Sequence, residues 1–173
     1  MRKNIFILFI LLSINCYSQN NSSYNKENYE TIVIKTALQE VNNNTIAMVD
    51  ISALTINLSV GWYKVEFVPL YNVNATTTGT GWDFGGGTAT ITNYSFRSEL
   101  PSTTTANYVN NYVARNQNFT TAQTSRINDN RGTIIVEFQC TVAGTLIPRF
   151  RSEIAGANVL VRIGSYLKLE KIE

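Results

Sequence analysis

The chain has 173 residues, of which 15% are charged, with 14 Lys and Arg against 12 Asp and Glu. Without its first 18 residues, about 155 residues remain, which is a typical size for one domain. The removed segment includes Arg2 and Lys3, so 14 − 2 = 12 basic residues remain against 12 acidic residues, and this domain is electrically neutral. Neutrality argues against a nucleic-acid-binding protein, and the absence of histidine excludes Ser-His-Asp and Cys-His catalysis and all histidine-based metal sites.

The first 18 residues predict a secretory signal peptide. Two positive charges in residues 1–4 precede an apolar run at residues 5–12, and a more polar stretch follows at residues 13–19. The apolar run is shorter than the ~20 residues that a transmembrane helix needs. We therefore expect cleavage after Ser18, a secreted or cell-surface location, and no membrane span in the mature chain.

The two cysteines carry different expectations. Cys16 leaves open a lipoprotein anchor, but the residue before a lipid-bearing cysteine is normally small, and Asn15 is not. Cys140 is the only cysteine left after cleavage, so it cannot form an internal disulfide. Because Cys140 lies in an alternating apolar run, we predict that it is a small buried hydrophobic residue.

The mature chain divides into a leader and one domain. Residues 19–44 form a polar, flexible leader that ends in an ambiguous segment at 31–41, where TIVI favours a strand and KTALQEV favours a helix. The domain is predicted to span residues 45–173.

From residue 45 onward the hydrophobic pattern has a period of two, which predicts β-strands. Strands are expected at residues 45–49, 54–58, 62–70, 88–96, 133–141, 145–151, 158–163 and 166–172. Turn-rich or polar connections are expected at residues 74–87, 98–106 and 128–132. Eight or more short strands in one domain indicate an all-β sandwich or closed β architecture.

Three pieces of sequence resemble a known family. They are residues 61–67 (GWYKVEF), residues 132–138 (GTIIVEF), and residues 143–150 (AGTLIPRF) together with 164–172 (GSYLKLEKI). Together they resemble the C1q/TNF-like jelly roll, in the version seen in phage tail-fibre and other virion structural proteins. The signal peptide departs from the phage version and favours a secreted or surface-attached bacterial protein.

The resemblance implies a two-sheet antiparallel jelly-roll sandwich of ten strands that assembles as a homotrimer, with the terminal strand near the three-fold axis. Members of the family act as receptor ligands, adhesins, or capsid and fibre heads. The resemblance implies no catalysis and no cofactor.

The last predicted strand provides a separate reason to expect a trimer. Tyr166, Leu167, Leu169 and Ile172 place apolar groups on both faces of this strand. A strand that is apolar on both faces must be covered on both sides. The opposite sheet is one cover, and a neighbouring subunit is predicted to be the other; the alternative is irregular packing within a monomer.

Two groups of aromatic residues are candidate binding sites. Trp82, Asp83 and Phe84 lie in a Gly- and Thr-rich stretch, where an exposed indole beside a carboxylate would suit a glycan. In the alternative, Trp82 folds back onto the sandwich. Tyr108 and Tyr112 offer a second polar-aromatic surface for a glycan or a protein receptor.

Catalysis and metal binding have weaker sequence support. The acidic residues, among them Asp83, Glu99 and Glu137, show no spacing typical of paired catalytic carboxylates. Residues 128–130 (NDN) are typical of a turn rather than a calcium site, and the glycines at 79–87 lack the lysine of a phosphate loop. We therefore expect a non-enzymatic protein that either assembles into a surface structure or binds a cell-surface ligand.

Overall fold

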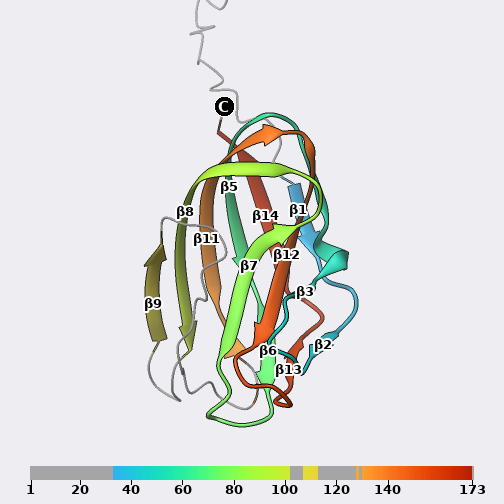
Figure 1. The fold of residues 1–173 in the computed structure, drawn as a ribbon, viewed down its shortest axis with the longest axis vertical. Coiled ribbons are helices and arrows are strands. Elements are labelled where there is room, and N and C mark those ends of the chain that lie inside the picture. Colours follow the sequence, from blue (N-terminus) through green and yellow to red (C-terminus); the bar gives the residue numbers. More distant parts are fainter. Residues whose placement is uncertain (1–32, 102–106, 113–127, 129, 173) are drawn as a thin grey trace, which may run out of the picture.

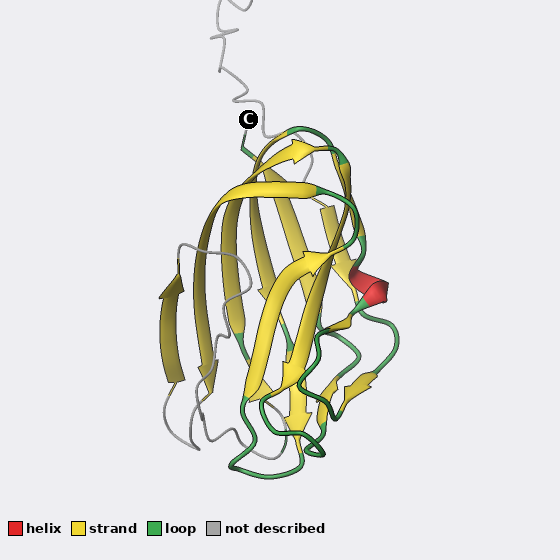
Figure 2. Cartoon of the chain, in the orientation of Figure 1, coloured by secondary structure: helices red, strands yellow, loops and turns green. Residues whose placement is uncertain are grey.

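The computed structural model describes residues 33–101, 107–112, 128 and 130–172, so the predicted signal peptide, Cys16 and most of the predicted leader lie outside the described residues. Within them the only helical element is one turn of 3-10 helix, Ser52–Leu54 (Figure 2). All pairs of described strands are antiparallel. The prediction of an all-β protein is confirmed.

One layer of the molecule is a sheet of six strands in the order β1-β14-β5-β11-β8-β9 (Figure 1). Its strands are β1 (Val33–Thr36), β14 (Tyr166–Lys171), β5 (Gly61–Val68), β11 (Thr133–Val142), β8 (Thr90–Pro101) and β9 (Asn107–Tyr112). Strand β5 shows the predicted alternation, because Tyr63, Val65 and Phe67 are buried whereas Lys64 is exposed.

The second layer contains two groups of strands. In one group the order is β10 (Asn130–Arg131), β6 (Leu70–Val73), β13 (Val159–Val161) and β2 (Val41–Asn43). In the other, β12 (Gly144–Ser152) pairs with β7 (Thr80–Gly86), β3 (Val49–Asp50) and β4 (Ile56–Leu58). In Figure 1, β7 and β12 lie in front of the six-stranded sheet.

The core between the layers centres on aromatic side chains. Trp82 of β7 is fully buried, and its ring centroid lies 5.7 Å from that of Phe67, 5.4 Å from that of Tyr71 and 5.8 Å from that of Phe150. Aromatic pairs at such separations add to the free energy of burial, by about 0.5–1.5 kcal/mol each. Because Phe67 comes from β5, the cluster joins the two layers.

A β-bulge in β8 changes the alternation predicted for residues 88–96. That alternation places Ile91 on the face opposite to Tyr94 and Phe96, but all three side chains are buried. Asn93 has a φ of 49°, and the β8–β11 register shifts beside it, between Glu137 and Gln139. The extra residue reverses the faces, so that Ile91, Tyr94 and Phe96 all point into the core.

Several predicted element boundaries are wrong. Residues 80–86 form strand β7 instead of a turn, and β8 continues to Pro101 where a loop is expected from Ser98. Residues 45–47 form a bend, so only Val49 of the strand predicted at 45–49 is in a strand. The turn predicted at 128–132 contains the short strand β10.

The ambiguous segment at residues 31–41 has no helix in its described part. It contains β1 and the start of β2. Strand β1 pairs with β14, and β2 pairs with β13. The sheets therefore include residues that precede position 45, where the domain is predicted to begin.

Candidate functional site

The predicted sugar platform is not on the surface. Trp82 and Phe84 point into the core from β7 and have no exposed side-chain surface. The Trp82 indole Nε1–H donates a hydrogen bond to the Thr80 Oγ1 at 2.9 Å, so the polar group of the ring is also satisfied internally. No ligand can stack on this ring in the folded protein, and the alternative in which Trp82 packs onto the sandwich agrees with the structure.

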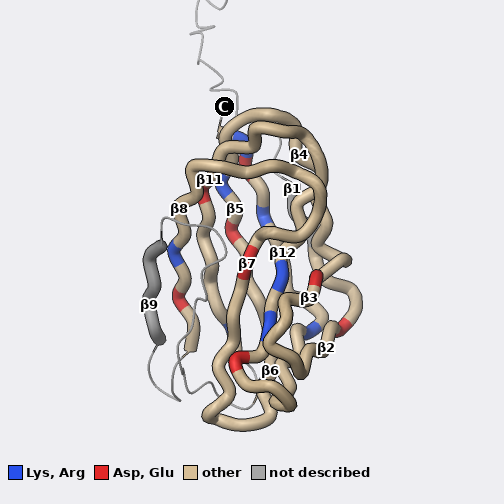
Figure 3. Tube along the Cα trace, in the orientation of Figure 1, with Lys and Arg blue, Asp and Glu red and all other residues tan. Residues whose placement is uncertain are grey.

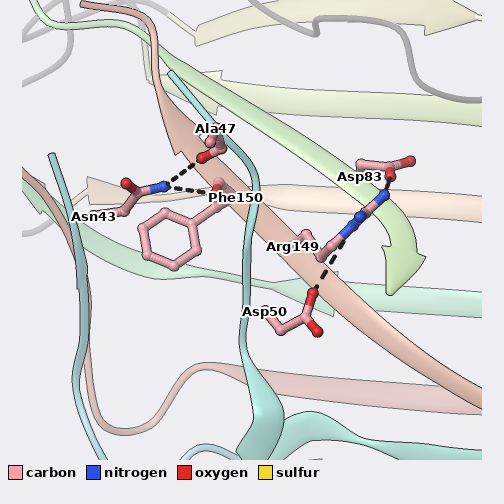
Figure 4. Close-up of polar contacts among 6 residues, drawn as sticks. All are labelled: Asn43, Ala47, Asp50, Asp83, Arg149 and Phe150. Atoms are coloured by element: carbon pink, nitrogen blue, oxygen red, sulfur yellow. Dashed lines mark hydrogen bonds and ion pairs between the residues drawn. The ribbon is translucent and has the colours of Figure 1, made fainter. Parts of the chain in front are cut away.

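Asp83 points to the opposite face of β7, where it meets Arg149 of β12. The two residues are paired in the β7–β12 register, and Arg149 Nη2 donates to Asp83 Oδ2 at 2.5 Å (Figure 4). The Nε of Arg149 also lies 4.0 Å from Oδ1 of Asp50 in β3. The side chain of Asp83 is 1% exposed, whereas that of Asp50 is 43% exposed. Arg149 therefore connects three strands through one buried and one partly exposed carboxylate.

Glycines of β7 make room for the arginines of β12. A Cβ atom at Gly85 would collide with the guanidinium of Arg149, and one at Gly81 would lie 2.8 Å from Nε of Arg151. The Gly-rich pattern therefore reflects the close approach of side chains to a strand backbone rather than a turn.

The tyrosines predicted to bind a ligand lie in the other layer. Tyr108 and Tyr112 are in β9 at the edge of the six-stranded sheet, opposite Leu100 and Phe96 of β8. Their side chains lie outside the described residues. The structure does not bring them together with Trp82, and their binding role stays a prediction.

The predicted trimer residues have different surroundings. Leu167 and Leu169 are buried in the core of the chain itself, whereas Tyr166 is partly exposed and Ile172 is exposed. The outward face of β14 carries Tyr166, Lys168 and Glu170, which are partly exposed. Side chains along the strand alternate between core and surface, so Leu167 and Leu169 are not available to a neighbouring subunit, whereas Tyr166 and Ile172 stay candidates for such a contact.

The outer face of the six-stranded sheet carries charges of both signs. The register places Lys168 opposite Glu66, and Lys64 lies between Glu170 on one side and Glu137 on the other. Figure 3 shows acidic and basic residues interspersed along β8, β11, β5 and β14. Opposite charges directly across neighbouring strands stabilise a sheet modestly, by about 0.2–1 kcal/mol per pair.

The end of β14 and the start of β5 lie at one end of this sheet, near the C label of Figure 1. Ile172 follows β14, and its N–H donates to the carbonyl of Trp62 at the start of β5 at 2.8 Å. Gly61 pairs with Cys140, which brings the start of β5 beside the end of β11. We call this group the end patch: Val60 (59% exposed), Trp62 (partly exposed), Val142 (55%) and Ile172 (49%).

Of the end patch, only Ile172 is predicted from the sequence to contact a neighbouring subunit. The other members lie at strand ends, where alternation no longer distinguishes buried from exposed residues. Val60 stands directly before the strand that begins at Gly61. This position does not indicate which other strand ends lie beside it.

Cys140 is buried, as predicted, and its thiol is free in the part of the chain that the structure describes. Burial raises the pKa of its thiol above the ordinary value of 9.0, and a smaller contribution from the Val142 backbone acts in the opposite direction. A thiol held in its protonated form is a poor nucleophile.

The part of the chain that the structure describes contains neither a cluster of metal-binding side chains nor a membrane-spanning helix. No three Cys, Asp or Glu side chains there are close enough to hold a metal ion together. The same residues contain no helix of the length and apolar character that would cross a membrane. Of residues 128–130, predicted as a turn, Asn130 is buried in β10.

No known family model matches the chain, and no curated protein is similar to it. The resemblance to the C1q/TNF-like jelly roll therefore depends on the three pieces of sequence described above. The function has to be inferred from the surfaces of the molecule itself.

Proposed function

We propose that the chain is a secreted or surface-exposed structural protein, with a C1q/TNF-like jelly-roll sandwich that assembles as a homotrimer. The observation that carries the proposal is the end patch, where apolar residues gather at the end of an otherwise polar sheet face. Exposed apolar groups that adjoin polar residues are typical of protein interaction sites.

A second copy of the same chain is the partner that fits this surface. The sheet face next to the end patch alternates acidic and basic residues, among them Lys64, Glu66, Lys168 and Glu170. Such a face is complementary to a copy of itself but not to a strongly acidic or strongly basic partner. Repeated contacts between identical copies close into a ring when the rotation between them allows it, and a trimer is one such ring.

The most deeply buried charges have a structural use. Asp83 and Arg149 hold β7 and β12 together, and Asp50 extends the contact to β3. Because the Asp83 carboxylate is buried against Arg149, it stabilises the packing of the strands and is not exposed to a substrate. This supports a role in which the sandwich serves as a rigid building block.

Light scattering tests the proposal directly. We expect wild-type protein at micromolar concentration to have three times the mass of one chain, and the double variant Val60→Lys/Ile172→Lys to have the mass of one chain. Leu38→Lys is the matched control, since Leu38 is also an exposed apolar residue but lies between β1 and β2, outside the end patch.

Two results would contradict the proposal. A wild-type mass equal to one chain would exclude the trimer, and a trimer that survives the double substitution would place the interface elsewhere. Far-UV circular dichroism of all three proteins shows whether the sandwich is intact. The alternative function, glycan or receptor binding through Tyr108 and Tyr112, predicts that Tyr108→Ala/Tyr112→Ala abolishes cell-surface binding while the mass is unchanged.

A further inference from the structure

Three connections between strands meet at the end of the sandwich opposite the end patch, and we call them the loop tip. They are residues 44–48 between β2 and β3, 74–79 between β6 and β7, and 153–158 between β12 and β13. The N–H of Gly156 donates to the Asn44 carbonyl at 2.8 Å, and this bond joins the first and third connections. The N–H of Asn74 donates to the Asn158 carbonyl at 3.2 Å, which joins the second to the third. In Figure 1 the β6–β7 and β12–β13 connections lie at the lower end of the molecule, whereas the C label is at the upper end.

Two isoleucines are exposed on the loop tip. Ile46 lies in the first connection and is 57% exposed, and Ile154 lies in the third and is 46% exposed. The backbones that carry them run side by side, because the N–H of Ser152 donates to the Thr45 carbonyl at 3.0 Å. The tip therefore presents aliphatic surface from two neighbouring loops.

A buried asparagine fixes the loop that carries Ile46. Asn43 is 4% exposed, and its Nδ2 donates to the Ala47 carbonyl at 2.9 Å and to the Phe150 carbonyl at 3.0 Å (Figure 4). Its Oδ1 accepts a hydrogen bond from the Thr45 N–H at 2.8 Å. One side chain thus holds the residues on both sides of Ile46 and connects them to β12.

A buried serine fixes the loop that carries Ile154. Ser152 has no exposed surface, and its Oγ accepts a hydrogen bond from the Ile154 N–H at 3.3 Å and donates to the Ile154 carbonyl at 2.9 Å. The N–H of Ala157 donates to the same carbonyl at 3.2 Å. Because both loops are already ordered, contact with a partner would not have to order them.

The loop tip itself is electrically neutral. Residues 44–48, 74–79 and 154–158 contain no charged residue, and the two charges next to Ile154 in sequence, Arg151 and Glu153, have opposite signs. Nη1 of Arg151 donates to the Ile46 carbonyl at 3.3 Å. Oε2 of Glu153 lies against Gly79, where a Cβ atom would collide with it. A neutral tip is not complementary to a strongly acidic or strongly basic partner.

We propose that the loop tip inserts Ile46 and Ile154 into the surface of a lipid bilayer with electrically neutral headgroups. Apolar side chains gain free energy when they leave water, and peripheral proteins bury such groups at the boundary between headgroups and acyl chains. The tip projects beyond the strands (Figure 1), and a lipid surface deforms around a projection, whereas a protein partner would need a fitted pocket. The inference goes beyond the proposed trimer and does not depend on it, because no end-patch residue belongs to the loop tip.

Vesicle flotation tests the proposal with protein recovered from outside the cytoplasm. We expect the wild type to float with phosphatidylcholine vesicles, in an amount that increases with lipid up to about 5 mM. The double variant Ile46→Ser/Ile154→Ser should bind at least about tenfold more weakly, because it loses the aliphatic surface of the tip. Leu38→Ser is the matched control and should bind as the wild type does, since Leu38 is exposed but lies between β1 and β2, outside the loop tip.

A nitroxide-labelled lipid in the same vesicles locates the contact. We expect it to broaden the amide signals of Ile46 and Ile154 in ¹⁵N-labelled protein and to leave that of Leu38 sharp. Light scattering of the double variant should give the mass of the wild type, so that a failure of this proposal is distinguishable from a failure of the proposed trimer.

Four results would overturn the proposal. The first is equal flotation of the wild type and the double variant, and the second is an equal loss of flotation in the Leu38→Ser control. The third is binding only to vesicles that contain phosphatidylglycerol, because it would assign the contact to charge. The fourth is the absence of both flotation and broadening at about 5 mM lipid, which would favour a protein partner for the tip.

Discussion

Asp83 shows how a single residue determines the local architecture. Its carboxylate is buried on the outward side of β7, and Arg149 supplies the compensating charge from the next strand. Removing one partner of a buried ion pair leaves an uncompensated charge, which costs about 3–5 kcal/mol, whereas an exposed pair contributes less than about 1 kcal/mol.

We predict that Arg149→Met lowers the free energy of unfolding by about 3 kcal/mol, as measured by urea denaturation. Asp50→Asn should cost less than about 1 kcal/mol, because the Asp50 carboxylate lies farther from Arg149 and is partly exposed. The double variant Asp83→Leu/Arg149→Met should recover most of the loss, since it removes both buried charges. Equal losses for Arg149→Met and Asp50→Asn would show that the buried pair has no special role.

The raised pKa of Cys140 predicts in which direction the free energy of unfolding changes with pH. Because its pKa is raised in the folded state, the unfolded chain loses the thiol proton first as the pH rises above about 9. The contribution of Cys140 to stability is therefore complete below that pH and is lost at higher pH. We expect wild-type protein to lose more unfolding free energy than Cys140→Ala between pH 7 and about pH 10.5, measured by urea denaturation. Parallel pH profiles would contradict this.

Strand β8 depends on one residue with an unusual backbone conformation. Asn93 has a positive φ, and its side-chain Nδ2 donates to Oε1 of Gln139 in β11 at 2.8 Å. Asparagine tolerates this region of backbone conformation better than most residues, and β-branched residues are the least suited to it. The bulge is what allows Ile91 and Phe96 to share the core face.

Substitutions at Asn93 should separate the backbone requirement from the side-chain contact. Asn93→Gly keeps the conformation and should change the free energy of unfolding by about 0.5 kcal/mol or less. Asn93→Val should lower it by about 1–3 kcal/mol, because valine is strained at positive φ. Thermal or urea unfolding of the two variants is the measurement, and equal stability would show that the bulge does not require this conformation.

Strand existence was predictable from sequence more often than strand position. The period of two identifies β5, β11, β12 and β14 because each alternates core and surface residues. Strand β7 escaped prediction because both of its faces are enclosed and its glycines, such as Gly81 and Gly85, accommodate side chains of β12. A glycine required by a tertiary contact has the same local signature as a glycine required by a turn.

At the scale of the whole molecule, the sequence predicted the all-β class but not which surfaces are free. From the sequence alone, Leu167 and Leu169 are candidates for contact with a neighbouring subunit, because the pattern does not show which face of their strand points inward. In the structure both side chains are buried in the core. The end patch is formed by residues far apart in the chain, since Val60 and Trp62 lie beside Val142 and Ile172. Such sites depend on strand pairing, which a periodic pattern does not specify.

Export of the protein gives a further test. Cleavage after Ser18 predicts that protein recovered from outside the cytoplasm begins at Gln19, as read by N-terminal sequencing or intact mass. A mature chain that begins at a lipid-modified Cys16 would instead support the lipoprotein alternative, and a chain that retains Met1 would contradict export by this route.

An experimental structure of the assembled protein tests the central proposal most directly, because it shows which faces are covered. We predict three copies in which Val60, Trp62 and Ile172 are buried between neighbours, while Leu167 and Leu169 remain in the core of each copy. An isolated chain with Val60 and Ile172 in open solvent would contradict the account.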